Sequence, residues 1–168
     1  ITQTVRSGRG GPEGDDPVKA LSVTSMGEAM VPVSSDRQIL GPSPLNFDAR
    51  GSEYVETLTP FRDDEWLYEI NGNTFANNYG LTKLLWIRDN QPALYDKTYK
   101  FLNWGGFVTF MLGSDPLLDY SLANRSLLFD LNKADWSDEL ISKAGFDREK
   151  LPDTVPSGTA IGEVSNAM

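Results

Sequence analysis

Short apolar runs near the amino-terminal end of the sequence predict two β-strands. Residues 18–23 (VKALSV) mix alternation with apolar neighbours, and residues 29–33 (AMVPV) form a second run before the polar residues 34–37. Because only five residues separate the two runs, we expect them to pair as a hairpin. The connecting residues, 24–28, would then follow a strand end, where α/β proteins commonly present ligand-binding groups.

Farther along the chain, apolar residues recur at spacings of three and four, which predicts helices. The clearest pattern includes Leu81, Leu84 and Leu85, and Pro92 both ends it and can open the next helix. Shorter patterns, some preceded by aspartate or followed by glycine, predict helices over residues 49–58, 92–99, 104–112, 119–128 and 135–144.

This order of elements predicts an α/β chain with few strands and several helices. Two strands do not form a stable sheet on their own, so we expect one part of a larger sheet-and-helix domain. Glycine, proline and charged residues predict a flexible N-terminal segment over residues 1–17 and a loop over residues 151–162. An incomplete sheet exposes an edge strand, so pairing of two copies into a homodimer is a further expectation.

The composition disfavours several classes of partner. The 168 residues carry 24 acidic and 15 basic side chains, a formal net charge of −9, which disfavours binding to nucleic acid and to anionic membrane surfaces. No apolar run approaches the roughly 20 residues that a membrane-spanning helix needs. The absence of cysteine fits a reducing compartment, and we expect a cytoplasmic protein.

The chain contains neither cysteine nor histidine. This absence excludes Ser-His-Asp triads, Cys-His nucleophiles and zinc sites built from these residues. Any chemistry must therefore use carboxylates, lysine, tyrosine, hydroxyls or groups supplied from elsewhere.

Several stretches resemble the FGGY carbohydrate kinases, such as the xylulose, glycerol and gluconate kinases. The most specific are TKLLWIRDNQPALY at residues 82–95 and DYSLAN at residues 119–124, the latter followed by FDL and DW. In family order, the likeness runs through residues 18–36, 41–53, 81–104, 110–141 and 151–165. The resemblance implies that residues 18–168 are part of the family's N-terminal, sugar-binding domain, which has the ribonuclease H-like (actin-like ATPase) fold.

The resemblance also implies phosphoryl transfer from ATP, with magnesium, to a hydroxyl of a sugar or polyol. Family members begin with an Asp-Gly-Thr phosphate loop and carry a catalytic aspartate in a Gly-Asp-Asn or Gly-Asp-Gln segment, and neither motif occurs here. We therefore expect no catalytic residue and no metal site on this chain. The missing remainder of the protein would bind ATP and magnesium, and this chain alone would be inactive.

Three residues of the 24–28 segment are candidates for substrate binding by this resemblance. Met26, Gly27 and Glu28 occupy the place of Gln-Arg-Glu in glycerol kinases or Gln-Met-His in xylulose kinases. A carboxylate such as that of Glu28 accepts hydrogen bonds from sugar hydroxyls, and the alternative is a solvated glutamate in the predicted hairpin. Gly27 replaces the arginine of glycerol kinases, so we expect open space and a substrate larger than glycerol. Met26 has packing as an alternative role.

Three further candidates come from the same comparison. Asp48 matches the aspartate of the family's Trp-x-Asp-x-Arg stretch, but it could instead cap the helix that follows. Asn78 lies five residues before Lys83, where glycerol kinases place a substrate-contacting tyrosine, and a helix-capping role is the alternative. Tyr79 takes this place if the alignment moves by one residue.

Two other functions remain open from the sequence. The first is a non-catalytic sugar-binding or regulatory domain of the same fold. The second is a glycosidase that uses Glu28 and Asp48, whose carboxylates would have to lie about 5 Å or roughly 6.5–9.5 Å apart across a cleft.

Overall fold

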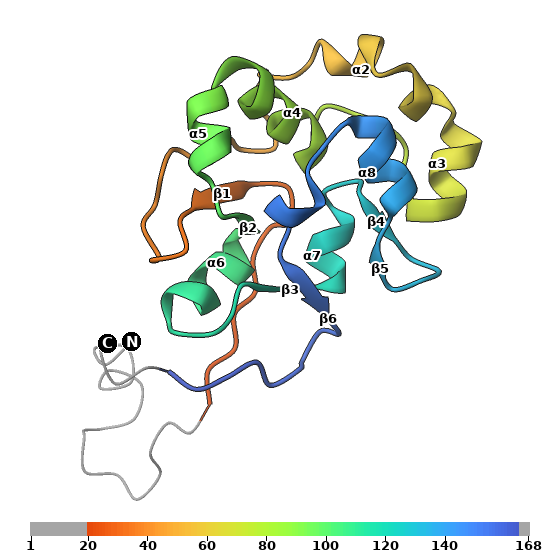
Figure 1. Cartoon of the computed structure of the whole chain (residues 1–168). Coiled ribbons are helices and arrows are strands. Elements are labelled where there is room, and N and C mark those ends of the chain that lie inside the picture. The colour runs from red at the N-terminus through yellow and green to blue at the C-terminus, as the bar shows by residue number, and fades with distance from the viewer. Residues whose placement is uncertain (1–19, 165–168) are drawn as a thin grey trace, which may run out of the picture.

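The structure of the protein is a computed structural model that describes residues 20–164 (Figure 1). Its α-helices are α2 (Tyr54–Thr57), α3 (Asp64–Asn71), α4 (Gly80–Asn90), α5 (Pro92–Lys97), α6 (Trp104–Met111), α7 (Tyr120–Asn124) and α8 (Asp138–Ala144). Two short 3-10 helices are η1 (Thr59–Arg62) and η2 (Arg148–Lys150). The strands are β1 (Met30–Val33), β2 (Lys100–Asn103), β3 (Leu117–Asp119), β4 (Phe129–Asp130), β5 (Asp135–Trp136) and β6 (Asp153–Val155).

The strands of residues 20–164 pair two by two. Strands β1 and β2 are antiparallel, with Val31 opposite Leu102. Val31 and Leu102 pack against α6, whereas Met30 and Phe101 belong to the larger core that contains α4. In Figure 1 the pair accordingly lies between α6 and the helices α4 and α5. Both faces of the pair are therefore covered by helices, as in α/β proteins.

Helix α4 lies in the larger core. Its residues Leu81, Leu84, Leu85 and Ile87 are at most 2% exposed. Around them pack buried side chains from most other elements, among them Phe61, Leu67, Phe101, Phe129, Trp136 and Leu140. Burial of one such side chain stabilises a fold by about 1.5–3 kcal/mol. Helix α4 is consequently well fixed, and so is the turn that leads into it.

The predicted hairpin is wrong. Strand β1 pairs with β2, which lies some seventy residues later in the chain. Residues 20–23 of the other predicted strand are outside any strand, and residues 18 and 19 are outside the described part of the chain. All four residues of β1 are buried, so it needs an apolar partner, and β2 supplies Phe101 and Leu102. The predicted flexible segment, residues 1–17, also lies outside the described residues.

Four predicted helices are confirmed as α4, α5, α6 and α8, although α8 begins only at Asp138 and residues 135–136 of that predicted helix form β5. Pro92 opens α5 as its first residue, where the missing N–H costs nothing. The side chain of Ser137 caps α8 by accepting a hydrogen bond from the backbone of Leu140. Gly145, with a φ of 62°, ends α8 in the left-handed conformation that favours glycine.

Two predicted helices are shorter in the structure. The helix expected at residues 49–58 is reduced to α2, because Gly51 has a φ of 80° and the residues before it form turns. The helix expected at residues 119–128 is reduced to α7. Asp119 caps α7, and Leu127 has a φ of 66°, which no helix accommodates.

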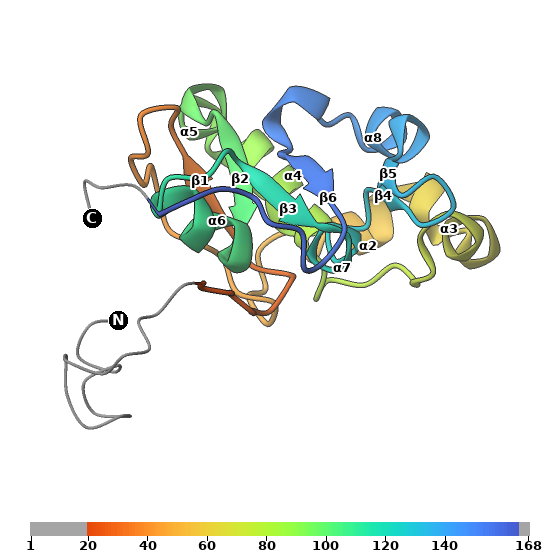
Figure 2. The same ribbon diagram turned by 90° about the horizontal axis from the view of Figure 1, so that it is seen from below.

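Other elements were not predicted. Helix α3 was missed although Asp63 caps its first turn and Gly72, with a φ of 76°, ends it. Strands β3 to β6 have two or three residues each, too few for a periodic pattern. Within the loop predicted at residues 151–162, β6 pairs in parallel with β3 (Figure 2).

Candidate functional site

Glu28 and Arg125 form an ion pair between two distant parts of the sequence. Glu28 precedes β1, and Arg125 follows α7. Both Nη2 and Nε of Arg125 donate to Oε1 of Glu28, at 2.5 and 2.8 Å. The Glu28 side chain is only 13% exposed and that of Arg125 33%. Both bonds fall on Oε1, so Oε2 accepts no hydrogen bond from residues 20–164.

Two further residues hold Arg125 in place. Its guanidinium lies over the ring of Tyr79, 4.6 Å from the ring centroid. Asn73 Oδ1 accepts hydrogen bonds from Arg125 Nη1 at 3.3 Å and from the Tyr79 hydroxyl at 3.1 Å. We call Glu28, Asn73, Tyr79 and Arg125 the Glu28 cluster. It combines acceptors, donors and an aromatic face, the groups that recognise sugars.

Hydrogen bonds between asparagine side chains hold the Glu28 cluster in place. Asn73 Nδ2 donates to Asn71 Oδ1 at 2.7 Å and to Asn124 Oδ1 at 2.8 Å. Asn71 is fully buried, and its own amide donates to the carbonyl of Phe129 at 2.8 Å. These hydrogen bonds connect the end of α3 to the end of α7, and they fix Asn73 in contact with Arg125.

Gly27 is where the structure corrects the sequence interpretation. A Cβ at this position would lie 2.4 Å from Cγ and 2.8 Å from Cβ of Arg125. The space that we expected to be open is therefore filled by the side chain of Arg125. Gly27 is held by a hydrogen bond from the Asn103 amide to its carbonyl. Next to it, Met26 is 53% exposed and takes no part in the core, contrary to the packing alternative.

Asp48 forms a second ion pair, with Arg50. Nε of Arg50 lies 3.0 Å from each carboxylate oxygen, and Nη2 lies 2.5 Å from Oδ2. The side-chain hydrogen bonds from Arg50 are the main reason that the pKa of Asp48 falls to about 2. Asp48 does not cap α2, since the residue before that helix is Glu53 and no side chain caps it. Its oxygens instead bind Arg50, whose guanidinium lies over the Trp86 ring.

Lys83 lies in the first turn of α4 and contacts the segment that leads into this helix. It is 3% exposed, and its amine donates to the carbonyl of Asn77 at 2.5 Å. Burial lowers the pKa of Lys83 to about 8. Asn77 in turn donates from its side chain to the carbonyl of Asp48 at 3.1 Å. The turn that carries Asn78 and Tyr79 is thus joined to the Asp48 segment, and Lys83 anchors it.

The structure brings some of the predicted site residues together and leaves others apart. Gly27, Glu28 and Tyr79 meet at Arg125. Asn78 is exposed and does not cap α4, whose preceding residue is Tyr79 without a side-chain cap. Sequence reasoning missed Asn73 and Arg125. Arg125 lies in the DYSLANRS stretch that already resembled the kinases, which was the available signal.

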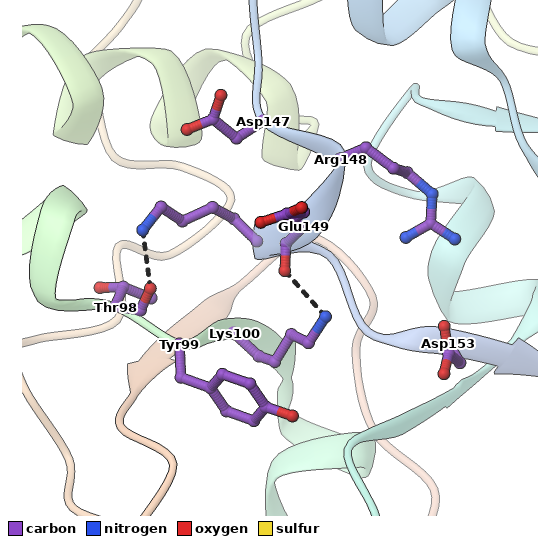
Figure 3. Close-up of a pocket in the computed structure, with 8 residues that line it drawn as sticks. Thr98, Tyr99, Lys100, Asp147, Arg148, Glu149 and Asp153 are labelled. Carbon is purple, nitrogen blue, oxygen red and sulfur yellow. Dashed lines mark hydrogen bonds between the residues drawn. The ribbon is translucent and has the colours of Figure 1, made fainter.

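A groove of about 1060 Å³ lies elsewhere, between the start of β2 and η2. Figure 3 shows the side chains that line it. Its two lysines are bound by backbone carbonyls: Lys100 donates to those of Glu149 and Leu151 at 2.8 Å, and Lys150 to that of Thr98 at 2.8 Å. These amines join the 148–151 segment to β2. We therefore assign the groove no ligand.

Within residues 20–164, no group of three or more acidic side chains is placed to hold a metal ion. The same residues form no helix with the length and apolar character of a membrane-spanning segment.

Comparisons with known proteins agree in family and fold. The profile "FGGY family of carbohydrate kinases, N-terminal domain" matches residues 13–168. The xylulose kinase of Bacillus subtilis is 26% identical over 147 residues, which are 88% of this chain and 29% of that protein. The autoinducer-2 kinase of Salmonella choleraesuis is 28% identical over 151 residues, or 88% of this chain and 28% of that protein.

A solved structure shows the same fold. The xylulose kinase from Rhodospirillum rubrum superposes with a TM-score of 0.80 at 23% identity, over 87% of this chain and 30% of that chain. The predicted fold class, part of an α/β domain of the actin-like ATPase fold, is confirmed. The chain spans less than a third of the length of each of these relatives.

Proposed function

Because the chain belongs to the FGGY family of carbohydrate kinases, within its N-terminal domain, we propose that it is the sugar-binding part of such an enzyme. The whole enzyme would transfer a phosphoryl group from ATP to a hydroxyl of a sugar or polyol. The observation that carries this proposal is the half-buried Glu28, which has one oxygen held by Arg125 and the other without a partner in residues 20–164.

The unpartnered oxygen of Glu28 is suited to a sugar hydroxyl. A carboxylate oxygen accepts hydrogen bonds in fixed directions, and its partial burial strengthens such a bond. Because Arg125 already fixes the carboxylate, the Glu28 side chain loses little further conformational entropy when a hydroxyl binds. Tyr79 offers an aromatic surface beside it, with its hydroxyl bound to Asn73. We assign Glu28 and Tyr79 to direct contact with the substrate.

The remaining candidates have different roles in this proposal. Met26 and Asn78 are exposed and would contact the substrate at the rim of the site. Gly27 gives Arg125 its space. Asp48 is a positioning residue, because Arg50 takes its carboxylate while its backbone carbonyl receives the Asn77 amide. Asp48 therefore acts through the turn that carries Tyr79.

The chemical step itself needs groups beyond the sugar site. Phosphoryl transfer depends on positioning and on stabilising charge at the transferring phosphate, which magnesium, basic residues and a catalytic aspartate provide. The described chain has no cluster of acidic residues that fits magnesium. We therefore assign ATP, magnesium and the catalytic base to the remainder of the kinase. We also propose a cytoplasmic location, where ATP is available; homodimer formation stays a prediction.

The proposal is tested with the complete kinase. It is incubated with ATP, magnesium and a pooled panel of pentuloses, hexuloses, aldonates and polyols, and mass spectrometry identifies any molecule that gains a phosphate. We expect one phosphorylated sugar or polyol. A folded protein that binds a sugar yet yields no phosphorylated product would favour the non-catalytic sugar-binding domain instead.

A further inference from the structure

We propose that Arg125 is a specificity-determining residue that, together with Glu28, binds two adjacent hydroxyls of a neutral sugar or polyol. This inference rests on the proposed function and names its substrate class. An arginine has five N–H donors, and three of those on Arg125 are used by Glu28 and Asn73. Two therefore have no partner within residues 20–164, and the side chain is 33% exposed.

The free groups of the pair match a vicinal diol. Glu28 has an acceptor at Oε2 that no hydrogen bond within residues 20–164 uses, and Arg125 has one unused N–H on each of Nη1 and Nη2. A hydroxyl can donate one hydrogen bond and accept others, so of two neighbouring hydroxyls one can donate to Glu28 and the other accept from Arg125. A compound with only one hydroxyl in this region would leave a half-buried charged group without its partner, which is costly.

Arg125 is held in the geometry that this role requires. The ring of Tyr79 fixes the plane of the guanidinium, and Asn73 binds one of its ends. Gly27 gives the side chain its space, because a Cβ there would lie 2.4 Å from Cγ of Arg125. An arginine placed beforehand loses less freedom when it binds. Arg125 can therefore take this position only because residue 27 has no side chain.

The charge of the pair favours a neutral substrate. Glu28 and Arg125 carry opposite charges within one ion pair, so no net positive charge is available to attract an anion. A sugar carboxylate placed at the donors of Arg125 would also lie near the carboxylate of Glu28, and like charges brought together at a binding site are disfavoured. We therefore expect neutral ketoses or polyols to bind better than aldonates.

The test uses calorimetric titration of the complete kinase with the panel of pentuloses, hexuloses, polyols and aldonates. Arg125→Lys keeps the charge but removes the planar guanidinium with its five N–H donors. We therefore expect about 10- to 100-fold weaker binding of the preferred neutral sugar. Arg148→Lys is the matched control, since Arg148 also pairs with a carboxylate, at 3.9 Å, and lies over a tryptophan ring. We expect its affinity to equal that of the wild type.

A second test does not depend on the lysine variant. Gly27→Ala should weaken sugar binding in the wild-type background, because the new Cβ displaces Arg125. In the Arg125→Gly background the same change should add little, since the nearest remaining atom is Leu122 Cδ2 at 3.4 Å. An equal loss in both backgrounds would show that Gly27 does not act through Arg125.

The outcomes separate this inference from the proposed function. Unchanged sugar affinity in Arg125→Lys would overturn the role of Arg125 while leaving the kinase assignment intact. Preferential binding of aldonates would overturn the choice of a neutral substrate. A wild-type kinase that binds no member of the panel would reject the proposed function itself.

Discussion

Replacing Lys83 with methionine is expected to remove a pH dependence from the stability of the protein. The Lys83 side chain is 3% exposed, with its amine bound to the carbonyl of Asn77 and the hydroxyl of Thr82. Burial is the main cause that lowers its pKa from 10.5 to about 8, and the nearby carboxylate of Asp48 partly opposes the change. The buried charged amine therefore destabilises the fold at neutral pH.

The sign and size of the effect follow from proton linkage. Between pH 8 and 10.5 the amine is largely neutral in the folded state and still protonated in the unfolded state. The unfolded state then binds more protons, so the free energy of unfolding rises with pH. At about 1.4 kcal/mol per pKa unit, the rise amounts to about 3 kcal/mol, complete near pH 10.5 and absent below pH 8.

Urea unfolding of the wild type and Lys83→Met from pH 7 to pH 10 measures this rise. Subtracting the two curves cancels other groups that titrate at high pH, such as Tyr95, whose pKa burial raises to about 12. The difference should grow in favour of the wild type above pH 8. Lys97→Met, at an exposed lysine, should give a constant difference. A constant difference for Lys83→Met as well would refute the reasoning.

Two stability predictions concern single backbone positions. Gly51→Ala should lower the free energy of unfolding by at least about 2 kcal/mol in a urea titration, because Gly51 has a φ of 80° and the added Cβ would meet the Thr82 carbonyl oxygen at 2.2 Å; an unchanged midpoint would contradict that conformation. Asp63→Ala should cost about 1 kcal/mol by removing the cap of α3, and Asp63→Asn, which keeps a capping oxygen, should restore most of it. Equal thermal unfolding midpoints for the two Asp63 variants would refute the capping role.

The helices were the predictable part of the fold, because their signals are local. Leucines at helical spacing predicted helix α4, and a glycine after its last residue marked the end of α8. The strand pairing was not predictable in the same way. The apolar run of β1 shows that the strand is buried, but nothing local identifies β2 as its partner. The nearer run at residues 18–23 was the wrong choice for that reason.

The candidate site shows the same limit. Glu28 and Tyr79 could be named from their places in the resemblance to the kinases. Arg125 also lies in a stretch that resembles the kinases, but its importance comes from its contact with Gly27, which is close only in the folded chain. A glycine in place of an arginine suggests open space when position 27 is considered alone. The structure shows that an arginine from another segment fills that space.

The most direct test of the central proposal is the affinity of the complete protein for the proposed sugar substrate when Glu28 is changed to glutamine. The change keeps the shape of the side chain and removes its charge. Calorimetric titration should show a loss of about 10- to 100-fold, since a hydrogen bond to a charged group is lost. Glu139→Gln, at an exposed glutamate that binds Trp66, should leave the affinity unchanged. Equal affinity of Glu28→Gln and the wild type would contradict the assignment of Glu28 to the sugar site.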